Sequence, residues 1–274
     1  MGIRLLTLGE IVGKPGIFTI KSGLEKLKQE HNIQGVIANG DGATHGYGLG
    51  RNHSIYLRKL GIDVITGGDQ IYFKKDLHPH LEQASYILRP ANFPPGNPGR
   101  GWRVYNFNGT KVGVINLLGL SGFNRVHPSN PFTFLPEITK RITDVSVLLV
   151  DFHSCTTAEK MAMALMSDGL VSAIVGTGMR AITSDAGLLP KGTAAISDLG
   201  RCGSIHSVGG FSPEKEIQQF VTAIPDRSHE WWMGLEIQGA VLEFDDQGKA
   251  VSIEPIRYPI ASPSSDIQTH DDDD

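Results

Sequence analysis

Four side chains that can bind metal ions or move protons each follow a short apolar segment of the chain. They are Glu10, Asp41, Asp69 and His153. Taken singly, each carboxylate is explained most simply as a solvated loop residue or a helix cap. Open α/β sheets gather their ligand sites at the carboxyl ends of the strands. We therefore expect these oxygen and imidazole groups to share one rim, which is the arrangement that a metal site needs.

The elements that must position these side chains alternate in type. Short apolar runs predict buried strands at residues 3–8, 35–38, 63–66, 145–150 and 172–175. Helical patterns lie between the first three of these runs. Two hairpins are also predicted, one around Asn108-Gly109 and one around the turn at 245–249. The order predicts an α/β fold in which mixed sheets form a sandwich rather than a plain open sheet.

The connection after the fourth predicted strand carries a helix-start signal. Thr156 and Glu159 have the spacing of a capping box, with Thr156 as the N-cap. The helix should therefore begin just after Thr156 and end near Gly169. This places Asp151, Phe152 and His153 on a loop between a strand and a helix.

Composition limits the class of protein. The chain has 274 residues, of which 40% are hydrophobic, and this supports a packed core. We expect one domain over residues 1–260 and a disordered acidic tail at 261–274. The net charge of −4, with no basic cluster longer than Lys74-Lys75, gives no indication of nucleic acid or an anionic membrane as a partner. Two cysteines and no apolar segment of membrane-spanning length favour a cytoplasmic protein.

Five segments carry a specific resemblance. From Arg4 to about Pro259, the chain resembles the YmdB-type branch of the calcineurin-like metallophosphoesterases. The resemblance implies a four-layer α/β/β/α sandwich of two mixed sheets. It also implies a two-metal centre, commonly of iron, manganese or magnesium, that hydrolyses phosphodiesters such as cyclic nucleotides. The segments that carry it are residues 9–16, 39–46, 89–94, 151–153 and 189–194.

Most metal-ligand positions of that family hold other residues in this chain. Glycine at two of them offers no side-chain ligand, and arginine at another brings a fixed positive charge to a place where a cation would sit. A glutamine at the family's acid position cannot donate a catalytic proton. The family's Asp corresponds to Glu10, its Glu-Asn pair to Asp41-Gly42, its Asn-His pair to Asp69-Gln70, and its two later His to Gly178 and Arg180, whereas His153 is unchanged.

These substitutions predict a catalytically degenerate homologue, a pseudoenzyme without a bound metal. Such a protein would act in binding, scaffolding or regulation, as a homo-oligomer or within a larger protein assembly. Arg180 is expected to form salt bridges with some of Glu10, Asp41 and Asp69, and thereby to fill the former metal cavity.

Two alternatives keep a ligand in the pocket. In the first, the chain is a metal-dependent phosphodiesterase with an altered site that holds one ion of Mg, Mn, Fe or Ca. Its ligands would be Glu10, Asp41, Asp69 and His153, with His45 or His153 in acid-base roles. In the second, the pocket binds a nucleotide or phosphate, and Arg180 replaces the metals as the anion's partner.

Overall fold

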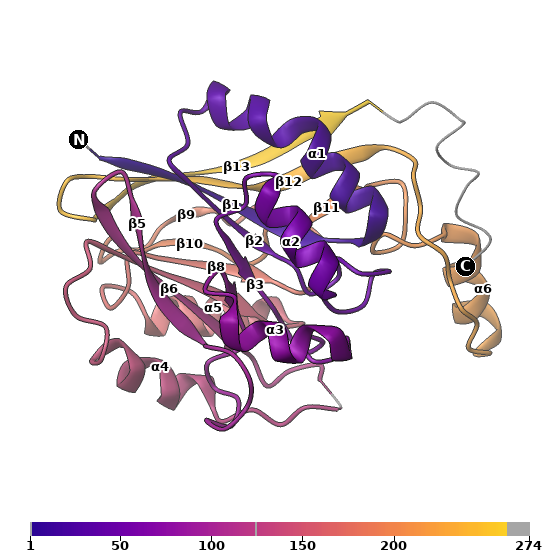
Figure 1. Cartoon of the computed structure of the whole chain (residues 1–274), viewed down its shortest axis with the longest axis horizontal. Coiled ribbons are helices and arrows are strands. Elements are labelled where there is room, and N and C mark those ends of the chain that lie inside the picture. The colour runs from indigo at the N-terminus through magenta and orange to yellow at the C-terminus, as the bar shows by residue number, and fades with distance from the viewer. Residues whose placement is uncertain (1, 124, 262–274) are drawn as a thin grey trace.

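The computed structural model describes residues 2–123 and 125–261, and two β-sheets form its centre (Figure 1). All but the first residue of the predicted acidic tail at 261–274 lies outside the described residues. The first sheet has seven strands: β1 (Ile3–Ile11), β2 (Gly35–Asn39), β3 (Val64–Thr66), β4 (Ile87–Leu88), β11 (Arg201–Ser204), β12 (Leu235–Phe244) and β13 (Ala250–Ile260). Their order is β13-β12-β11-β1-β2-β3-β4, and β12 also pairs with β1.

The second sheet has six strands and is also mixed. Strands β6, β7, β8 and β10 run parallel, and the edge strands β5 and β9 run antiparallel to their neighbours. The strands, in the sheet order β5-β6-β7-β8-β10-β9, are β5 (Trp102–Phe107), β6 (Thr110–Leu118), β7 (Val147–His153), β8 (Ala173–Thr177), β10 (Ala194–Ile196) and β9 (Gly187–Leu188).

Helices cover the outer face of each sheet. One apolar cluster joins the first sheet to α1 (Gly13–Glu30), α2 (Arg51–Lys59) and α3 (His78–Gln83), which follows the 3-10 turn Lys75–Leu77. Another joins the second sheet to α4 (Pro131–Thr139) and α5 (Thr157–Met166). A third cluster fills the space between the sheets. The predicted four-layer α/β/β/α sandwich is therefore confirmed.

The end of β7 differs from the prediction. Asp151, Phe152 and His153 were expected on a loop, but they are the last three residues of the strand. They pair in parallel register with residues 116–118 of β6, and all three are buried. The strand continues to His153 because the backbone of β6 supplies hydrogen-bond partners as far as that residue. His153 is therefore held by a sheet rather than by a loop.

The helix α6 (Pro213–Thr222) was not predicted. It lies in the long connection between β11 and β12, and Figure 1 shows it projecting from the body of the molecule. Ser212 caps its first turn, Pro213 follows the cap, and Glu214 and Glu216 lie in the first turn. These are ordinary start signals, so the sequence did contain the evidence for this helix. No helix of the described part of the chain is long and apolar enough to cross a membrane.

Candidate metal centre

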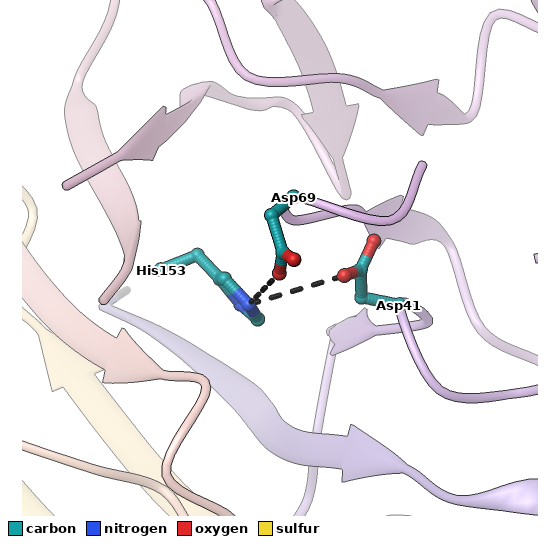
Figure 2. Close-up of side chains that lie close together, drawn as sticks. All are labelled: Asp41, Asp69 and His153. Atoms are coloured by element: carbon teal, nitrogen blue, oxygen red, sulfur yellow. Dashed lines mark ion pairs between the residues drawn. The ribbon is translucent and has the colours of Figure 1, made fainter. Parts of the chain in front are cut away.

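Three of the predicted side chains meet where the two sheets approach each other. Asp41 follows β2, Asp69 lies in the connection after β3, and His153 ends β7. One ligand atom from each lies within 4.8 Å of the other two. Nε2 of His153 is 3.5 Å from Oδ1 of Asp69 and 3.9 Å from Oδ2 of Asp41 (Figure 2). The first sheet thus supplies two carboxylates and the second supplies the imidazole.

Backbone donors fix the carboxylate of Asp41. Its Oδ1 accepts a hydrogen bond of 2.6 Å from the amide of Gly68, and its Oδ2 accepts one of 3.0 Å from the amide of Gln70. The amide of Asp41 in turn donates to Oδ1 of Asn39 at 3.0 Å. Gly68 has to be glycine, because a Cβ there would lie 2.4 Å from Nε2 of His153. The loops after β2 and β3 therefore hold each other in place.

A buried polar network orients His153. Oγ1 of Thr177 donates to Oδ1 of Asp151 at 2.7 Å and lies 3.0 Å from Nδ1 of His153. Because that hydroxyl already donates to Asp151, it accepts from Nδ1–H of His153. This arrangement leaves Nε2 to face the two carboxylates, which is the orientation that a metal-binding histidine needs. Asn39, whose amide lies 3.2 Å from Oδ2 of Asp151, completes the network.

The charges of this group are strongly coupled. Burial opposes protonation of His153, but the carboxylates of Asp69 and Asp41 outweigh it and raise the pKa of His153 to about 9. Burial raises the pKa of Asp41 to about 7, against the lowering effect of His153. Without a metal, a proton on His153 balances the acidic group. A divalent cation would take over that balancing charge and release the proton.

Arg180 and Glu10 form a second centre beside the first. Nη2 of Arg180 donates to Oε1 of Glu10 at 2.6 Å and to the carbonyl of Gly46 at 2.8 Å, and Nη1 donates to the carbonyl of Gly209 at 3.0 Å. The side chain of Glu10 is only 4% exposed and that of Arg180 only 14%. Burial disfavours the charged guanidinium, but the carboxylate of Glu10 outweighs this and raises the pKa of Arg180. The predicted salt bridge is confirmed for Glu10, whereas Asp41 and Asp69 face His153.

Of the two predicted glycine positions, Gly42 borders this pair and Gly178 borders His153. A Cβ at Gly42 would lie 2.5 Å from Oε1 of Glu10 and 2.9 Å from Nη2 of Arg180. Gly178 has a φ of +104°, and a Cβ there would lie 3.1 Å from Nε2 of His153. The space that a ligand side chain would need at position 42 is therefore used by the Glu10–Arg180 pair.

The remaining candidates, Gln70 and His45, lie outside the three-residue group. Gln70 contributes its amide to Asp41, and its buried side-chain oxygen has no hydrogen-bond partner among the described residues. His45 is 57% exposed, and its Nδ1 lies 3.9 Å from Oε1 of Glu230. Sequence reasoning gave no role to Asn39 or Thr177. Each is the last residue of its strand, β2 or β8, and this position at a strand end is the signal that could have identified them.

Asp41, Asp69 and His153 suit one divalent cation. Two carboxylates and one imidazole are ligands that such ions accept, and backbone and side-chain hydrogen bonds hold two of the three in place. The structure separates Glu10 from this group, because the guanidinium of Arg180 already occupies its carboxylate. The expected four-ligand set is thus divided into a three-residue group and an ion pair.

Relatives of known and unknown function share most of this chain. A Bacillus subtilis (strain 168) protein named 2',3'-cyclic-nucleotide 2'-phosphodiesterase is 36% identical over 256 residues, which is 93% of this chain and 96% of the relative. The crystal structure of a novel phosphatase of Mycoplasma pneumoniae has a TM-score of 0.90 and 33% identity, covering 96% of this chain and 95% of that one. A hypothetical protein of Thermus thermophilus has a TM-score of 0.88 and 30% identity, covering 95% and 100%.

These findings overturn the predicted pseudoenzyme. The prediction of a degenerate, non-catalytic homologue was wrong, because close relatives over almost the whole chain are named as a phosphodiesterase and a phosphatase. The physical error was to require every ligand of a two-metal centre. The structure retains a compact group of two carboxylates and one imidazole, and Arg180 pairs with Glu10, the fourth residue of the predicted ligand set.

The resemblance inferred from five short segments extends over nearly the whole chain. A model of the family described as "YmdB-like protein" matches residues 6–256, a range that includes both the Asp41, Asp69 and His153 group and the Glu10–Arg180 pair. The predicted family is confirmed, and the chain belongs to the YmdB-like proteins.

Proposed function

We propose that this protein is a metal-dependent phosphodiesterase that acts on cyclic nucleotides or related phosphodiesters, with one cation held by Asp41, Asp69 and His153. The observation that carries the proposal is the convergence of two carboxylates and one imidazole within 4.8 Å. The 36% identical relative named 2',3'-cyclic-nucleotide 2'-phosphodiesterase supports this substrate class. When bound, a divalent cation supplies Lewis-acid polarisation of a phosphoryl oxygen and activation of water.

The donor set favours Mn²⁺ or Fe²⁺ for this position. Carboxylates suit Mg²⁺, Ca²⁺ and Mn²⁺, whereas imidazole suits the transition metals, so a mixed set selects an ion that accepts both. Thr177 and Asp151 keep Nε2 of His153 directed at the carboxylates. We place the activity in the cytoplasm, because Cys155 and Cys202 are both free thiols, as is usual in a reducing compartment.

Arg180 provides the positive charge that a second cation gives in the resembled family. Three carboxylates in one pocket would repel a phosphodiester anion, but the guanidinium neutralises Glu10 at 2.6 Å. Three of its five N–H groups donate to Glu10, Gly46 and Gly209, which leaves two that can donate to a phosphate oxygen. We therefore assign Arg180 to substrate binding, with Glu10 and the carbonyls of Gly46 and Gly209 holding it in place.

The metal requirement is tested by loading the purified protein with Mn²⁺ and measuring metal content and hydrolysis of 2',3'-cyclic AMP. Asp41→Asn and His153→Gln should each lower metal affinity and activity. The loss should exceed the roughly 10- to 100-fold that is typical when a residue hydrogen-bonded to a metal ligand is removed. Asp144→Asn is the matched control, because this carboxylate is 82% exposed and pairs with Lys111. Full activity of metal-free protein, or of both ligand variants, would refute the proposal.

The acid step gives a second test. Gln70 holds no ionisable proton, so it cannot protonate an alkoxide leaving group. Gln70→His should raise kcat for 2',3'-cyclic AMP, within the roughly 10²- to 10⁴-fold range of general acid catalysis. It should change kcat little for bis(p-nitrophenyl) phosphate, whose leaving group needs no proton. Equal gains on both substrates would show that position 70 acts in some other way.

A further inference from the structure

The loop after β2 carries an exposed aromatic ring at the rim of the candidate site. The ring of Tyr47 stacks on that of Phe211, with 5.1 Å between the ring centroids and an angle of 25° between the ring planes. Phe211 is buried, at 6% exposed, whereas Tyr47 is 46% exposed. One face of the Tyr47 ring is therefore supported by a buried ring, and the other face is open to solvent.

Phe211 also supports Arg180. The guanidinium carbon of Arg180 lies 5.8 Å from the centroid of the Phe211 ring. Nη2 of Arg180 donates at 2.8 Å to the carbonyl of Gly46, which is the residue before Tyr47. A Cβ at Gly46 would lie 2.3 Å from Cζ of Phe211, so the loop and the buried ring are in close contact. These contacts hold an open aromatic face next to a guanidinium that has two N–H groups to offer.

Backbone hydrogen bonds hold the loop that presents Tyr47. The amide of Thr44 donates to the carbonyl of Gly48 at 2.9 Å, and the amide of Tyr47 donates to the carbonyl of Thr44 at 3.2 Å. The amide of Gly48 donates to the carbonyl of Asp41 at 2.5 Å, which ties the loop to a residue of the candidate metal centre. The loop is therefore preorganised, and a ligand that packs on Tyr47 loses little affinity to ordering of the loop.

The other exposed aromatic side chains lack this support. Tyr56, Phe73 and Phe220 are also exposed, but among the described residues none of them contacts a second aromatic ring. Single exposed apolar side chains of this kind are normal on a protein surface and need no functional explanation. Tyr47 differs because a buried ring fixes its orientation and because it lies beside the site.

We propose that Tyr47 is the binding platform for the nucleobase of the substrate, which stacks on the open face of the tyrosine ring while the phosphate lies at Arg180. This inference rests on the proposed function and narrows it from phosphodiesters in general to nucleotides. Every base has a planar π-face, so stacking on Tyr47 accepts any of the bases and discriminates against phosphodiesters that carry no ring. The ring of Tyr47 performs this role, and its hydroxyl group is not needed.

Equilibrium binding tests the platform without any need for turnover. Adenosine 3'-monophosphate is titrated into the full-length protein loaded with Mn²⁺ in a calorimeter, and inorganic phosphate is measured by its competition with this nucleotide. The parent protein should bind the nucleotide more tightly than phosphate. Tyr47→Leu should weaken nucleotide binding by roughly 5- to 150-fold, the range that stacking of one base provides, and should change phosphate affinity by less than about twofold.

Two further variants isolate the aromatic ring. Tyr47→Phe should bind the nucleotide as the parent does, because the ring is retained. Tyr56→Leu is the matched control, since Tyr56 is 37% exposed but lies on α2. It should leave the affinities for both probes unchanged.

The proposal is overturned if the parent binds the nucleotide no more tightly than phosphate, or if Tyr47→Leu weakens both probes equally or neither. It is also overturned if Tyr47→Phe loses as much affinity as Tyr47→Leu, or if Tyr56→Leu does. Hydrolysis of 2',3'-cyclic AMP, measured in parallel, separates this inference from the proposed function. Binding that depends on Tyr47 without turnover would refute the activity alone, whereas turnover with binding that is independent of Tyr47 would refute the platform alone.

Discussion

Gly42 shows at the scale of one residue how the substituted positions depend on each other. A side chain at position 42 and the ion pair between Glu10 and Arg180 need the same space, since a Cβ there would lie 2.5 Å from Oε1 of Glu10. An arginine at position 180 is therefore compatible with glycine at position 42 and not with the asparagine of the resembled family. Gly42 and the Glu10–Arg180 pair therefore depend on each other, because the pair uses the space that a side chain at position 42 would fill.

Gly42→Ala should therefore destabilise the fold. The added methyl group must displace the Glu10 carboxylate from its 2.6 Å contact with Arg180, at a cost of about 1–3 kcal/mol in the free energy of unfolding. Urea unfolding measures the change. Gly96→Ala is the control, because nothing lies within 4 Å of a Cβ at that position, and it should stay within about 0.5 kcal/mol of the parent. Equal stability of both variants would contradict the crowding at position 42.

The sequence predicted which side chains meet but not how they pair. Glu10 and His153 lie at the carboxyl ends of β1 and β7, and Asp41 and Asp69 lie in the connections after β2 and β3, so the strand ends of the two sheets bring all four near one rim. That convergence follows from periodicity alone. The division into Glu10 with Arg180 and two carboxylates with His153 depends on side-chain directions and on the amide donors to Asp41. Those are properties of the packed structure, which no spacing in the sequence encodes.

At the scale of an element, the connection between β7 and α5 differs instructively from its prediction. Thr156 caps α5 as predicted, since its side chain accepts from the amide of Glu159. The other half of the predicted capping box does not form. Glu159 instead accepts from the amide of Leu120 at 2.7 Å, the amide of Ser121 at 3.1 Å and Oγ of Ser154 at 2.6 Å. A local motif was replaced by a tertiary one, because the loop after β6 offered better donors.

Glu159→Gln should destabilise the protein by about 1.5–3 kcal/mol at pH 7, because hydrogen bonds to a charged acceptor are lost. Burial opposes ionisation of Glu159, but the donors from Leu120, Ser154 and Ser121 outweigh it and lower the pKa of Glu159. Stabilisation by the carboxylate is therefore complete above its unfolded pKa and is lost as the pH falls through the folded pKa.

Urea unfolding at several pH values checks this sign. The gap between the parent and Glu159→Gln should be widest near neutral pH and should narrow as the solution becomes acidic. Glu25→Gln, on the exposed side of α1, is the control and should show no such gap. A gap that is constant with pH would mean that the charge of Glu159 has no part in its effect.

The loop that carries Arg180 and the strand that carries Glu10 meet at one buried carboxylate. Asp198 accepts from the amide of Met179 at 3.0 Å and from the amide of Gly200 at 2.8 Å, and it forms an ion pair with Lys160. The carbonyl of Gly200 in turn accepts from the amide of Glu10 at 3.0 Å. Asp198 thus supports both sides of the Glu10–Arg180 pair from behind.

Asp198→Asn should be among the most damaging single changes in the chain. It leaves the 2% exposed ammonium of Lys160 without its counter-charge, which costs about 3–5 kcal/mol in the free energy of unfolding. Adding Lys160→Met should recover a large part of that loss, because the double variant buries no unpaired charge. If the two losses simply add, the two side chains act independently and the assignment of an ion pair is wrong.

At the scale of the whole molecule, the layers were predictable and the sheet orders were not. Buried apolar runs and hairpin signals specify strands and their outer helices locally. β1 pairs with β11 and β12, whose residues lie almost 200 positions or more further along the chain. No pattern in these three segments indicates which strands will pair. The candidate centre depends on this long-range order, since Asp41 and Asp69 come from the first sheet and His153 from the second.

A cation at this position would tie the two sheets together, so its binding should stabilise the whole fold. Only the folded chain brings Asp41, Asp69 and His153 within 4.8 Å, and therefore the ion binds the native state in preference to the unfolded one. At a free Mn²⁺ concentration of 100 times the dissociation constant, the free energy of unfolding should rise by about 2.7 kcal/mol. Removal of the ion with a chelator should reverse the gain.

Two variants determine whether the gain arises at this centre. Asp41→Asn removes one ligand between the sheets and should abolish the dependence of stability on Mn²⁺, whereas the exposed Asp144→Asn should preserve it. Urea unfolding at increasing Mn²⁺ measures both. A gain that survives in Asp41→Asn would place the stabilising ion elsewhere in the chain. If the gain is lost in Asp41→Asn and kept in Asp144→Asn, the ion binds at the strand ends where the two sheets meet and holds the sheets together there.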